Sequence, residues 1–454
     1  MNLLNTIYKH FKNESLYRNS IYLMASTGVL AVSGFVFWLF VARLFNPDSV
    51  GIATTLISVS TLIGSFSLLG LNVSIITYVP KSNEKNNIIN ASFTIAILAS
   101  IIVAIIFILG LNIFSPQLLF LQKNIFYILA FIIFMIGFTL NSLMESTYTA
   151  FRAAGNILIK NSIASVLKVL FIFVFIYFGA FGIFGSFSLA VLVSVFISAI
   201  ILIYKYDYRP KFSLDNQVIK KLARFSIANY VSGFLYQAPS LILPLIVLNH
   251  LHAKAAAYYY IDTMILNLLI IIPVAASQSL LTEGSHNITL MENHIRKAVK
   301  ITTILLVPAI FIVFFFGHFV LYFFGHTYET DAFRFLQIVS LSSVFMSVVV
   351  FGNAILRIHH KIKPLIFLNI IGCLVILITT YYSLSFQLVG LGWGWTIAQA
   401  LVAAFYLWYL IKTKNISFKK RGFFKIDINF NQIISIFFYG KKLGSSSSIF
   451  SKSK

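Results

Sequence analysis

Charged side chains are scarce in this sequence. Asp, Glu, Lys and Arg make up only 10% of the 454 residues, whereas a soluble domain carries roughly a quarter. Acidic residues are the fewest, with 12 Asp and Glu against 34 Lys and Arg, and there is a single cysteine, Cys373. One cysteine excludes a disulfide within the chain and any metal cluster built on cysteine. The low charge, together with the apolar runs that recur along the chain, excludes a soluble enzyme with one membrane anchor.

Long apolar runs take the place of charge. Hydrophobic residues make up 59% of the chain, with 47 Phe and 22 Tyr. Apolar runs recur from Ile21 to Leu410, and a run of about 20 residues crosses a hydrocarbon core of about 30 Å as a helix. We therefore predict an all-α integral membrane protein with about 12 transmembrane helices. The predicted helices cover residues 20–43, 50–79, 88–111, 124–150, 161–180, 183–204, 223–248, 254–281, 298–324, 333–357, 363–383 and 388–411.

Lys and Arg fall mainly on one side of the membrane if the N-terminus is placed inside. Cytoplasmic loops hold an excess of these residues, and on this placement the outer side holds only Arg43, Lys123, Lys254 and Arg334. Both ends are then cytoplasmic, and the cell membrane is the expected location. The net charge of +22 follows from this topology and from attraction to anionic inner-leaflet lipid. Membrane lipids, and not nucleic acid, are therefore the expected partners.

The widest predicted inner loop, Lys205–Arg224, falls at the midpoint of the helices and is the expected linker between two bundles of six. We predict five segments: a cytoplasmic interfacial helix, a six-helix bundle, a cytoplasmic linker, a second six-helix bundle and a basic, mostly disordered cytoplasmic tail. In this order they cover residues 1–19, 20–204, 205–222, 223–411 and 412–454.

An internal repeat supports the division into two bundles. Arg152 follows the fourth predicted helix and Arg357 ends the tenth, within similar segments 205 positions apart. At the ends of the first and seventh predicted helices, Val41–Leu44 can be set against Val247–Leu251. Parallel halves related by an axis along the membrane normal occur in transporters that alternate access to a central site. We expect the same arrangement here.

The order of several short motifs resembles one transporter family. Arg43–Gly51 is similar to its turn between helices one and two, and Tyr78–Lys81 to the end of its second helix. Phe151–Asn156 resembles its turn after helix four, and Phe324–Tyr328 its turn before helix ten. On these motifs the chain resembles the polysaccharide and oligosaccharide flippases of the multidrug/oligosaccharidyl-lipid/polysaccharide (MOP) exporter superfamily, over nearly all of residues 18–412.

This resemblance implies a V-shaped, MATE-like pair of bundles around a central cavity. It also implies a flippase or exporter that moves a lipid-linked oligosaccharide from the inner to the outer leaflet by alternating access. The carrier lipid would be a polyprenyl phosphate or pyrophosphate, and the pathway would make a surface polysaccharide or glycan. Glycosyltransferases of the same pathway are then the functional partners.

Ionisable residues inside the predicted helices are the first candidates for a site, because each costs about 2.5–3.5 kcal/mol at the membrane centre. Glu145 and Lys168 stand at similar distances on either side of the turn near Asn156, and so at one depth. They fit a structural ion pair. Lys168 also fits a cavity position that attracts the carrier phosphate, or a side chain that reaches the inner surface.

Asp262 lies inside the eighth predicted helix with no cation near it in the local sequence. A carboxylate there must be protonated, paired across helices or hydrated by a cavity. It fits coupling to a proton or sodium gradient, and it fits equally an ion pair with a cation from another helix, such as Arg43 at the outer rim. Glu283, near the inner end of its helix, is expected to be solvated.

The seventh predicted helix carries a polar stripe. Tyr236 and Gln237 follow Asn229 and Tyr230 by seven positions, so that each pair lies on one helix face. Such side chains suit sugar hydroxyl groups, and they serve equally well in hydrogen bonds between helices. The candidates for substrate binding or coupling are therefore Arg43, Lys168, Tyr236, Gln237 and Asp262.

Two other functions fit a chain of this kind. An ion-coupled MATE-type antiporter for a drug or metabolite would need more acidic residues in its bundles than Glu145 and Asp262. A membrane glycan polymerase usually presents a long outer loop with catalytic Arg or His, and the predicted outer loops are short. No nucleotide-binding glycine loop, nucleophile motif or metal-ligand cluster is found in the sequence. We therefore expect a transporter that is not an enzyme and that needs no cofactor or metal.

Overall fold

The computed structural model describes residues 15–214, 216–286 and 291–413, with side chains described over 18–214, 230–281 and 291–413. Most of the predicted interfacial helix and nearly all of the predicted tail lie outside these residues.

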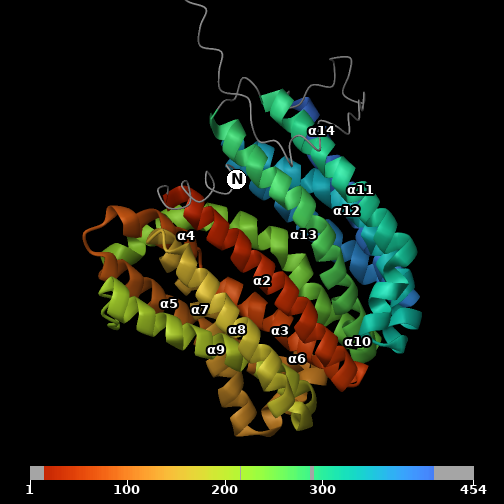
Figure 1. The fold of residues 1–454 in the computed structure, drawn as a ribbon, viewed down its shortest axis with the longest axis horizontal. Helices are drawn as coiled ribbons and strands as arrows, with labels where there is room; N and C mark the ends of the chain where they lie inside the picture. Colours follow the sequence, from red (N-terminus) through yellow and green to blue (C-terminus); the bar gives the residue numbers. More distant parts are fainter. Residues whose placement is uncertain (1–14, 215, 287–290, 414–454) are drawn as a thin grey trace, which may run out of the picture.

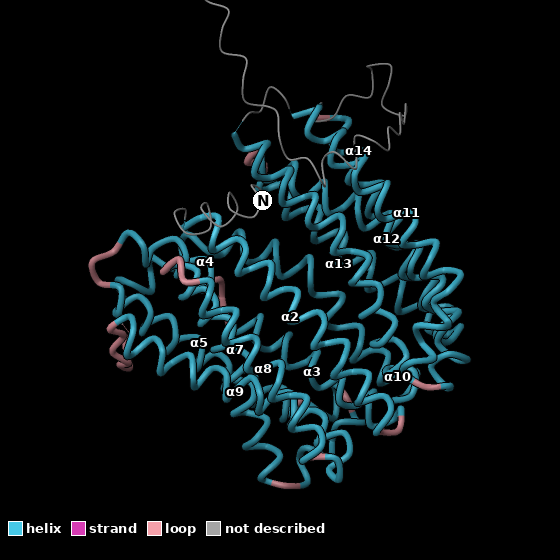
Figure 2. The backbone as a smooth tube through the Cα atoms, in the orientation of Figure 1, coloured by secondary structure: helices cyan, strands magenta, loops and turns pink. Residues whose placement is uncertain are grey.

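The described chain forms α-helices and short 3₁₀-helices, without a strand (Figure 2). The α-helices are α2 (Ser15–Leu44), α3 (Pro47–Ser67), α4 (Leu71–Tyr78), α5 (Lys85–Leu109), α6 (Leu111–Phe114), α7 (Ile125–Ala150), α8 (Ala154–Val174), α9 (Gly179–Tyr206), α10 (Asn216–His286), α11 (Met291–Phe324), α12 (His326–Ile358), α13 (Ile362–Ser383) and α14 (Gln387–Lys412). The 3₁₀-helices are η1 (Val79–Lys81), η2 (Pro116–Lys123), η3 (Ile176–Phe178) and η5 (Leu384–Phe386).

Ten stretches of the described chain are long and apolar enough to cross a membrane. Two of them, Tyr230–Leu281 and Ile362–Lys412, hold 52 and 51 residues, more than twice the roughly 20 that one crossing needs. The first is broken at His252, whose φ of 65° and ψ of 176° are not helical. The second turns at η5, between α13 and α14. The prediction of an all-α fold with about twelve membrane helices is therefore confirmed.

Local sequence signals place two of the helix starts. Asn46 accepts a hydrogen bond from the backbone N–H of Ser49 at 2.8 Å, and Asn124 accepts one from the N–H of Phe126 at 2.9 Å. Asparagine is a preferred residue at this capping position, and Pro47 suits the first position of α3 because it has no N–H to leave unpaired. These caps begin α3 at Pro47, before its predicted start at 50, and α7 at Ile125, close to its predicted start at 124.

The second predicted helix, 50–79, is interrupted. α3 ends at Ser67 and α4 begins at Leu71, because Leu69 and Gly70 have φ values of 48° and 81°. Glycine adopts this left-handed conformation readily, whereas other residues rarely do. Gly70 is therefore the sequence signal for the break, although the apolar pattern continues through it.

From α7 in the first half and α12 in the second, the two halves repeat the same elements at a constant offset. The turn after α7 and the turn after α12 have one backbone residue each in the left-handed region, Arg152 with φ of 52° and His360 with φ of 54°. Arg152 is thus equivalent to His360 and not to Arg357. The predicted offset of 205 is wrong, since the similarity of the two segments is too weak to determine the register. Element boundaries 208 positions apart are Ala150 and Ile358, Ala154 and Ile362, Ile176 and Leu384, and Gly179 and Gln387.

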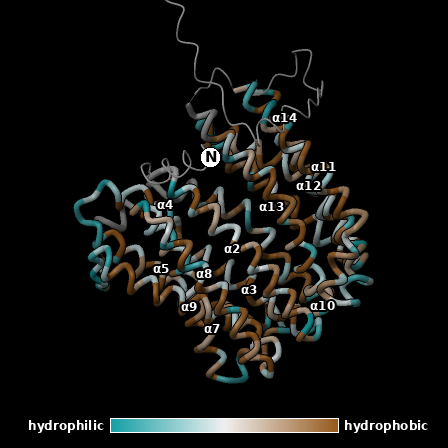
Figure 3. The backbone as a smooth tube through the Cα atoms, viewed as in Figure 1, coloured by the Kyte–Doolittle hydropathy of each residue, from teal (hydrophilic) through white to brown (hydrophobic). Residues whose placement is uncertain are grey.

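The helices form two bundles, α2–α9 and α10–α14, arranged as a V (Figure 1). The bundles lie closest near α3 and α10 and diverge toward α4 and α14 (Figure 1). Contacts between them run mainly between α3 and α10, with further contacts between α2 and α11. The long helices are coloured mostly as hydrophobic, and hydrophilic residues gather toward their ends (Figure 3). This distribution matches a protein whose bundles are surrounded by lipid.

Candidate functional site

The first bundle holds a cavity of about 290 Å³, which we call the N-half cavity. Its walls come from α2, α3, α7, α8 and α9, and its lining mixes apolar side chains with hydroxyl and amide groups. Two of the predicted site residues, Glu145 and Lys168, line it. The other lining residues are Leu30, Thr61, Gly64, Ser65, Leu68, Phe138, Asn141, Ser142, Asn161, Ala164, Ser165, Phe187 and Val191.

Glu145 pairs with Lys160, a residue that was not among the predicted site residues. Lys160 Nζ lies 3.0 Å from Glu145 Oε1, and the lysine side chain is only 1% exposed. Lys160 Nζ also donates a hydrogen bond to Asn141 Oδ1. α7 ends at Ala150 and α8 begins at Ala154, so the turn is centred before Asn156 and Lys160 lies level with Glu145, whereas Lys168 lies about two helical turns further along α8. The predicted ion pair between Glu145 and Lys168 is not formed, and Lys160 takes the place of Lys168.

Lys168 is left without an acidic partner. It is 7% exposed, and its Nζ lies 5.8 Å from the ring centre of Phe37 and 5.7 Å from that of Phe187. Among the described side chains no carboxylate lies within ion-pair distance of it. Aromatic faces attract a cation through the negative potential above the ring. The structure therefore holds the ammonium group at the cavity wall and leaves its charge available to an anion.

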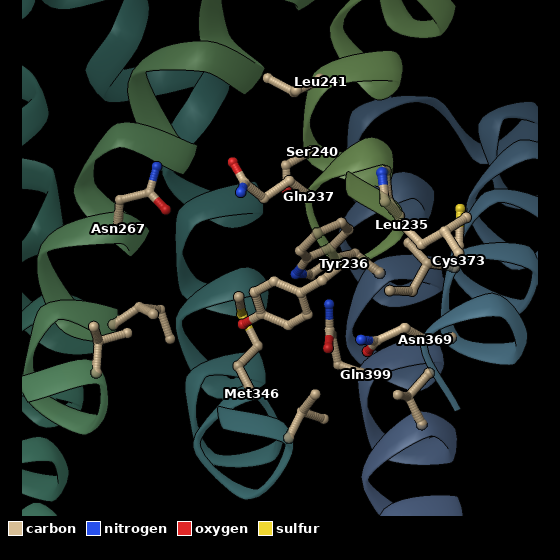
Figure 4. Close-up of a pocket in the computed structure, with 18 residues that line it drawn as sticks. Leu235, Tyr236, Gln237, Ser240, Leu241, Asn267, Met346, Asn369, Cys373 and Gln399 are labelled. Carbon is tan, nitrogen blue, oxygen red and sulfur yellow. The ribbon is translucent and has the colours of Figure 1, made fainter. Parts of the chain in front are cut away.

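The second bundle holds a cavity of the same size, about 290 Å³, which we call the C-half cavity. Its walls come from α10, α12, α13 and α14, and both Tyr236 and Gln237 line it. Figure 4 shows these two side chains between Asn267 on one side and Asn369 and Gln399 on the other. None of its described lining residues is acidic or basic. The remaining ones are Leu235, Pro239, Ser240, Leu241, Ile270, Val274, Met346, Val349, Gly372, Cys373, Ile376, Trp395 and Val402.

The two cavities occupy equivalent places in the two halves. Asn161 Nδ2 donates to Ser26 Oγ, and Asn369 Nδ2 donates to Ser232 Oγ, both at 2.9 Å. Each bond joins the fifth membrane-crossing helix of its half to the first: α8 to α2 in the first half, and α13 to α10 in the second. Lining residues equivalent at the offset of 208 include Phe138 and Met346, Asn141 and Val349, Ser165 and Cys373, Lys168 and Ile376, Phe187 and Trp395, and Val191 and Gln399. In the first two helices of each half the offset is 206, which pairs Leu30 with Tyr236, Thr61 with Asn267, Gly64 with Ile270, and Leu68 with Val274.

Charge distinguishes the two cavities. Lys168 on the wall of the N-half cavity corresponds to the apolar Ile376 in the C-half cavity, and Glu145 corresponds to the neutral Asn353. The buried Lys160 corresponds to Leu368. The N-half cavity is therefore cationic around Lys168, whereas the C-half cavity offers amide and aromatic side chains without charge. The repeated asparagines were missed in the sequence because an offset of 205 does not align them.

Arg43 is not the partner of Asp262. Its Nε donates to the carbonyl oxygen of Phe323 and its Nη2 to that of Tyr322, both at 2.7 Å. These carbonyls belong to the last turn of α11, and helix C-termini attract cations because their final carbonyl groups are unpaired. The guanidinium carbon also lies 5.9 Å from the ring centre of Tyr322. Arg43 therefore ties α2 of the first bundle to α11 of the second.

Asp262 is fully buried, and within the described part of the chain neither of its carboxylate oxygens has a hydrogen-bond partner. It follows Tyr259 by three positions, and the Tyr259 ring lies 5.7 Å from the ring of Phe335 in α12. Residues three apart share one helix face, so Asp262 belongs to the face of α10 that packs on α12. It lines neither the N-half nor the C-half cavity.

Comparison with known proteins identifies the family. A family profile described as Polysaccharide biosynthesis protein matches residues 16–281, which is more than half of the chain. The chain belongs to the polysaccharide biosynthesis protein family. A second profile, described as MatE, matches residues 230–382 of the same family member. No curated protein matches the sequence.

Solved structures similar to this family member are transporters. A MATE in complex with MaL6 gives a TM-score of 0.62 at 16% identity, over 88% of this chain and 96% of that one. A MOP superfamily transporter from Pyrococcus furiosus gives a TM-score of 0.60 at 15% identity, over 88% of this chain and 95% of that one. An outward-facing multidrug resistance MATE family transporter gives a TM-score of 0.61 at 17% identity, over 88% of this chain and 95% of that one. The fold is therefore MATE-like, and the family member is a multi-pass membrane protein.

The two bundles of this family member are joined at the end that carries Arg43. Asn249 Nδ2 donates to the carbonyl oxygen of Phe114 at 2.6 Å, which is the counterpart in the repeat of the bond between Arg43 and the Tyr322 carbonyl. Gly51 of α3 packs so closely on α10 that a Cβ atom there would lie 1.8 Å from the carbonyl oxygen of Ala253. The V is thus closed at this end.

Proposed function

We propose that this family member is a transporter of the flippase class, which moves a lipid-linked oligosaccharide on a polyprenyl phosphate or pyrophosphate carrier from the inner to the outer leaflet of the cell membrane. The observation that carries the proposal is the pair of equivalent cavities with unequal charge. The substrate has the same division, since an anionic phosphate joins neutral sugars to the lipid. Glycosyltransferases that build a surface polysaccharide or glycan would supply it.

The N-half cavity suits the phosphate group. Lys160 is neutralised by Glu145, whereas Lys168 has aromatic neighbours and no acidic one. Ionisable residues inside membrane helices commonly mark the path of a substrate or ion, because their cost must be offset by a role. A phosphate beside Lys168 would have its charge compensated within the bundle, and it would not need a free cation to accompany it.

The C-half cavity suits the sugars. The side-chain amides of Gln237, Asn267 and Gln399 line it and have no hydrogen-bond partner within the described protein. Each amide offers two donors and one acceptor oxygen, which matches the alternating donors and acceptors of sugar hydroxyl groups. The rings of Tyr236 and Trp395 add flat apolar surfaces for the C–H faces of a sugar ring.

Alternating access gives the joined end a role. We place the end with Arg43 on the outer side and both chain ends in the cytoplasm, because Lys and Arg gather at the other end. The structure then corresponds to a conformation closed to the outside, in which substrate enters from the inner leaflet. Opening to the outside requires the bonds of Arg43 and Asn249 across the two bundles to break.

Flipping by the full-length protein in proteoliposomes that contain a lipid-linked oligosaccharide tests the role of Lys168. Lys168→Met should slow flipping about tenfold or more, because a hydrogen bond to a charged group contributes about 1.5–3 kcal/mol. Lys168→Arg should retain most of the activity, since it keeps the charge. Lys363→Met, which removes an exposed lysine from the other half, is the matched control and should flip at the normal rate.

Normal flipping by Lys168→Met would contradict the phosphate role. An equal loss in the Lys363→Met control would assign the effect to surface charge and not to the cavity. A wild-type protein that exchanges an organic cation but does not flip the lipid would overturn the proposed substrate.

An ion-coupled antiporter for a drug or metabolite is the second candidate, and Asp262 favours it. An unpaired carboxylate inside a membrane helix fits a role in carrying a proton. In that case an imposed pH gradient should accelerate transport by the wild type, and Asp262→Asn should remove this acceleration. Asp48→Asn, at an exposed position of α3, is the control. Flipping at one rate with and without the gradient would count against coupling through Asp262.

A further inference from the structure

A third cavity lies on the flank of the first bundle and belongs to neither half-cavity. Its volume is about 560 Å³, and α5, α7, α9 and the segment 207–214 wall it. It uses a different face of α7 from the N-half cavity, since Leu140 and Met144 line it in place of Asn141 and Glu145. Its lining is mostly apolar. The other residues that line it are Asn90, Phe93, Thr94, Ile97, Leu98, Leu192, Val195, Phe196, Ala199, Tyr208, Pro210, Lys211 and Phe212.

The segment 207–214, which we call the strap, is held in place by α5. Asn90 Nδ2 donates to the carbonyl oxygen of Arg209 at 2.9 Å, and Asn90 Oδ1 accepts a hydrogen bond from the Tyr208 hydroxyl at 2.6 Å. Ser213 Oγ donates to Asn87 Oδ1 at 3.1 Å. These bonds hold the strap against α5. The mostly apolar cavity therefore has a polar wall at the end where the strap lies.

The strap and the last turn of α9 place positive charge at this end. Lys205, Arg209 and Lys211 are all exposed, and Lys211 lines the cavity itself. None of these three has an ion-pair partner among the side chains that the structure describes. Asp207 is the one carboxylate within the strap. The cavity therefore combines an apolar length along the helices with an excess of unpaired cations at one end.

We propose that this cavity binds an anionic phospholipid, with an acyl chain along α5 and α9 and the phosphate beside Lys211 and Arg209. Its volume lies within the range of about 300–1,000 Å³ typical of ligand pockets. Burial of each methylene group of a chain is favourable, and basic residues at the membrane surface attract anionic headgroups. The predicted orientation puts the strap on the cytoplasmic side, where anionic lipids concentrate. This inference does not depend on what the transporter carries.

Photocrosslinking of the purified full-length protein tests where the phospholipid binds. The probe is phosphatidylglycerol with a diazirine in its acyl chain, and its adducts are mapped by proteolysis and mass spectrometry. We expect adducts within residues 90–98 and 192–212. Unlabelled phosphatidylglycerol should displace the probe at a concentration about 25-fold lower than phosphatidylcholine of the same chains, since Arg209 and Lys211 each contribute about fivefold.

Two variants distinguish binding of the lipid acyl chain from binding of the lipid headgroup. Arg209→Ala with Lys211→Ala should keep the adducts but remove the preference for phosphatidylglycerol, whereas Ala199→Trp should abolish the adducts by filling the cavity. The matched controls are Lys363→Ala and Ile102→Trp, the latter at a 58% exposed position of α5 outside the cavity, and both should behave as wild type. Equal displacement by the two lipids, an unchanged preference in the double variant, or adducts elsewhere alone would each overturn the proposal.

Discussion

At the scale of single residues, two lysines on one helix show how packing decides the role of a charge. Lys160 and Lys168 both lie in α8 and both are buried. Lys160 is neutralised by Glu145, whereas Lys168 lies near two aromatic rings and has no acidic partner among the described side chains. The prediction that Glu145 and Lys168 share one depth is wrong, because it placed the turn near Asn156. α7 ends at Ala150 and α8 begins at Ala154, so Lys160 lies level with Glu145, and Lys168 lies about two helical turns further along α8. Helix ends are the least reliable part of a prediction from sequence, and an error of a few residues at the turn exchanges one lysine for the other.

Removal of the Glu145 carboxylate should lower the free energy of unfolding, because it leaves the buried Lys160 charge without a partner. Glu145→Gln leaves Lys160 charged at a 1% exposed site. Loss of one partner of a fully buried pair costs about 3–5 kcal/mol, and the 38% exposure of Glu145 reduces this to about 2 kcal/mol. The midpoint of thermal unfolding in detergent should therefore fall.

The matched control for this loss is Glu329→Gln, which removes the charge from the pair with His326, where the histidine is 79% exposed. Its unfolding midpoint should remain close to that of the wild type. Midpoints that fall equally in both variants would show that burial of Lys160 is not the cause.

At the scale of elements, one glycine sets the contact between the bundles. Gly51 lets the backbones of α3 and α10 approach more closely than any side chain would allow. The sequence predicts the approximate start of α3 through Asn46 and Pro47, because caps are local. The contact with Ala253 could not be predicted, since it joins positions about two hundred residues apart and leaves no periodic signal.

A methyl group at this contact should hold the outer end open. In Gly51→Ala the new Cβ would overlap the Ala253 carbonyl, so that the bundles must separate there. Arg43→Ala should act in the same direction, because it removes the two hydrogen bonds that Arg43 of α2 donates to the last turn of α11. Spin labels on the two bundles at the predicted outer end should report a longer distance in both variants.

Gly233→Ala is the control for this measurement, since a Cβ at Gly233 would meet no atom within 4 Å. It should give the wild-type distance distribution. A wild-type distribution in Gly51→Ala would show that the joined end tolerates the methyl group and that Gly51 does not control closure.

At the scale of the whole molecule, the membrane makes part of the fold predictable. Apolar length and the placement of Lys and Arg predict twelve crossings and two halves, because lipid imposes both constraints on each helix separately. The equivalence of the halves at 208 positions emerges only from the turns at Arg152 and His360. The walls of the two cavities correspond only when the halves are aligned in that register. Lys168 and Tyr236 could therefore be selected as candidates from the sequence, but their positions in two equivalent cavities could not be predicted.

The location of the two cavities in separate bundles makes the proposed substrate a bivalent ligand. Once its phosphate is bound in one half, its sugars meet the other half at a high effective concentration, provided that the chain between them spans the gap. A free sugar or a bare carrier phosphate makes only one of the two contacts and competes weakly. The transporter would thereby select finished substrates over their precursors without a separate recognition step.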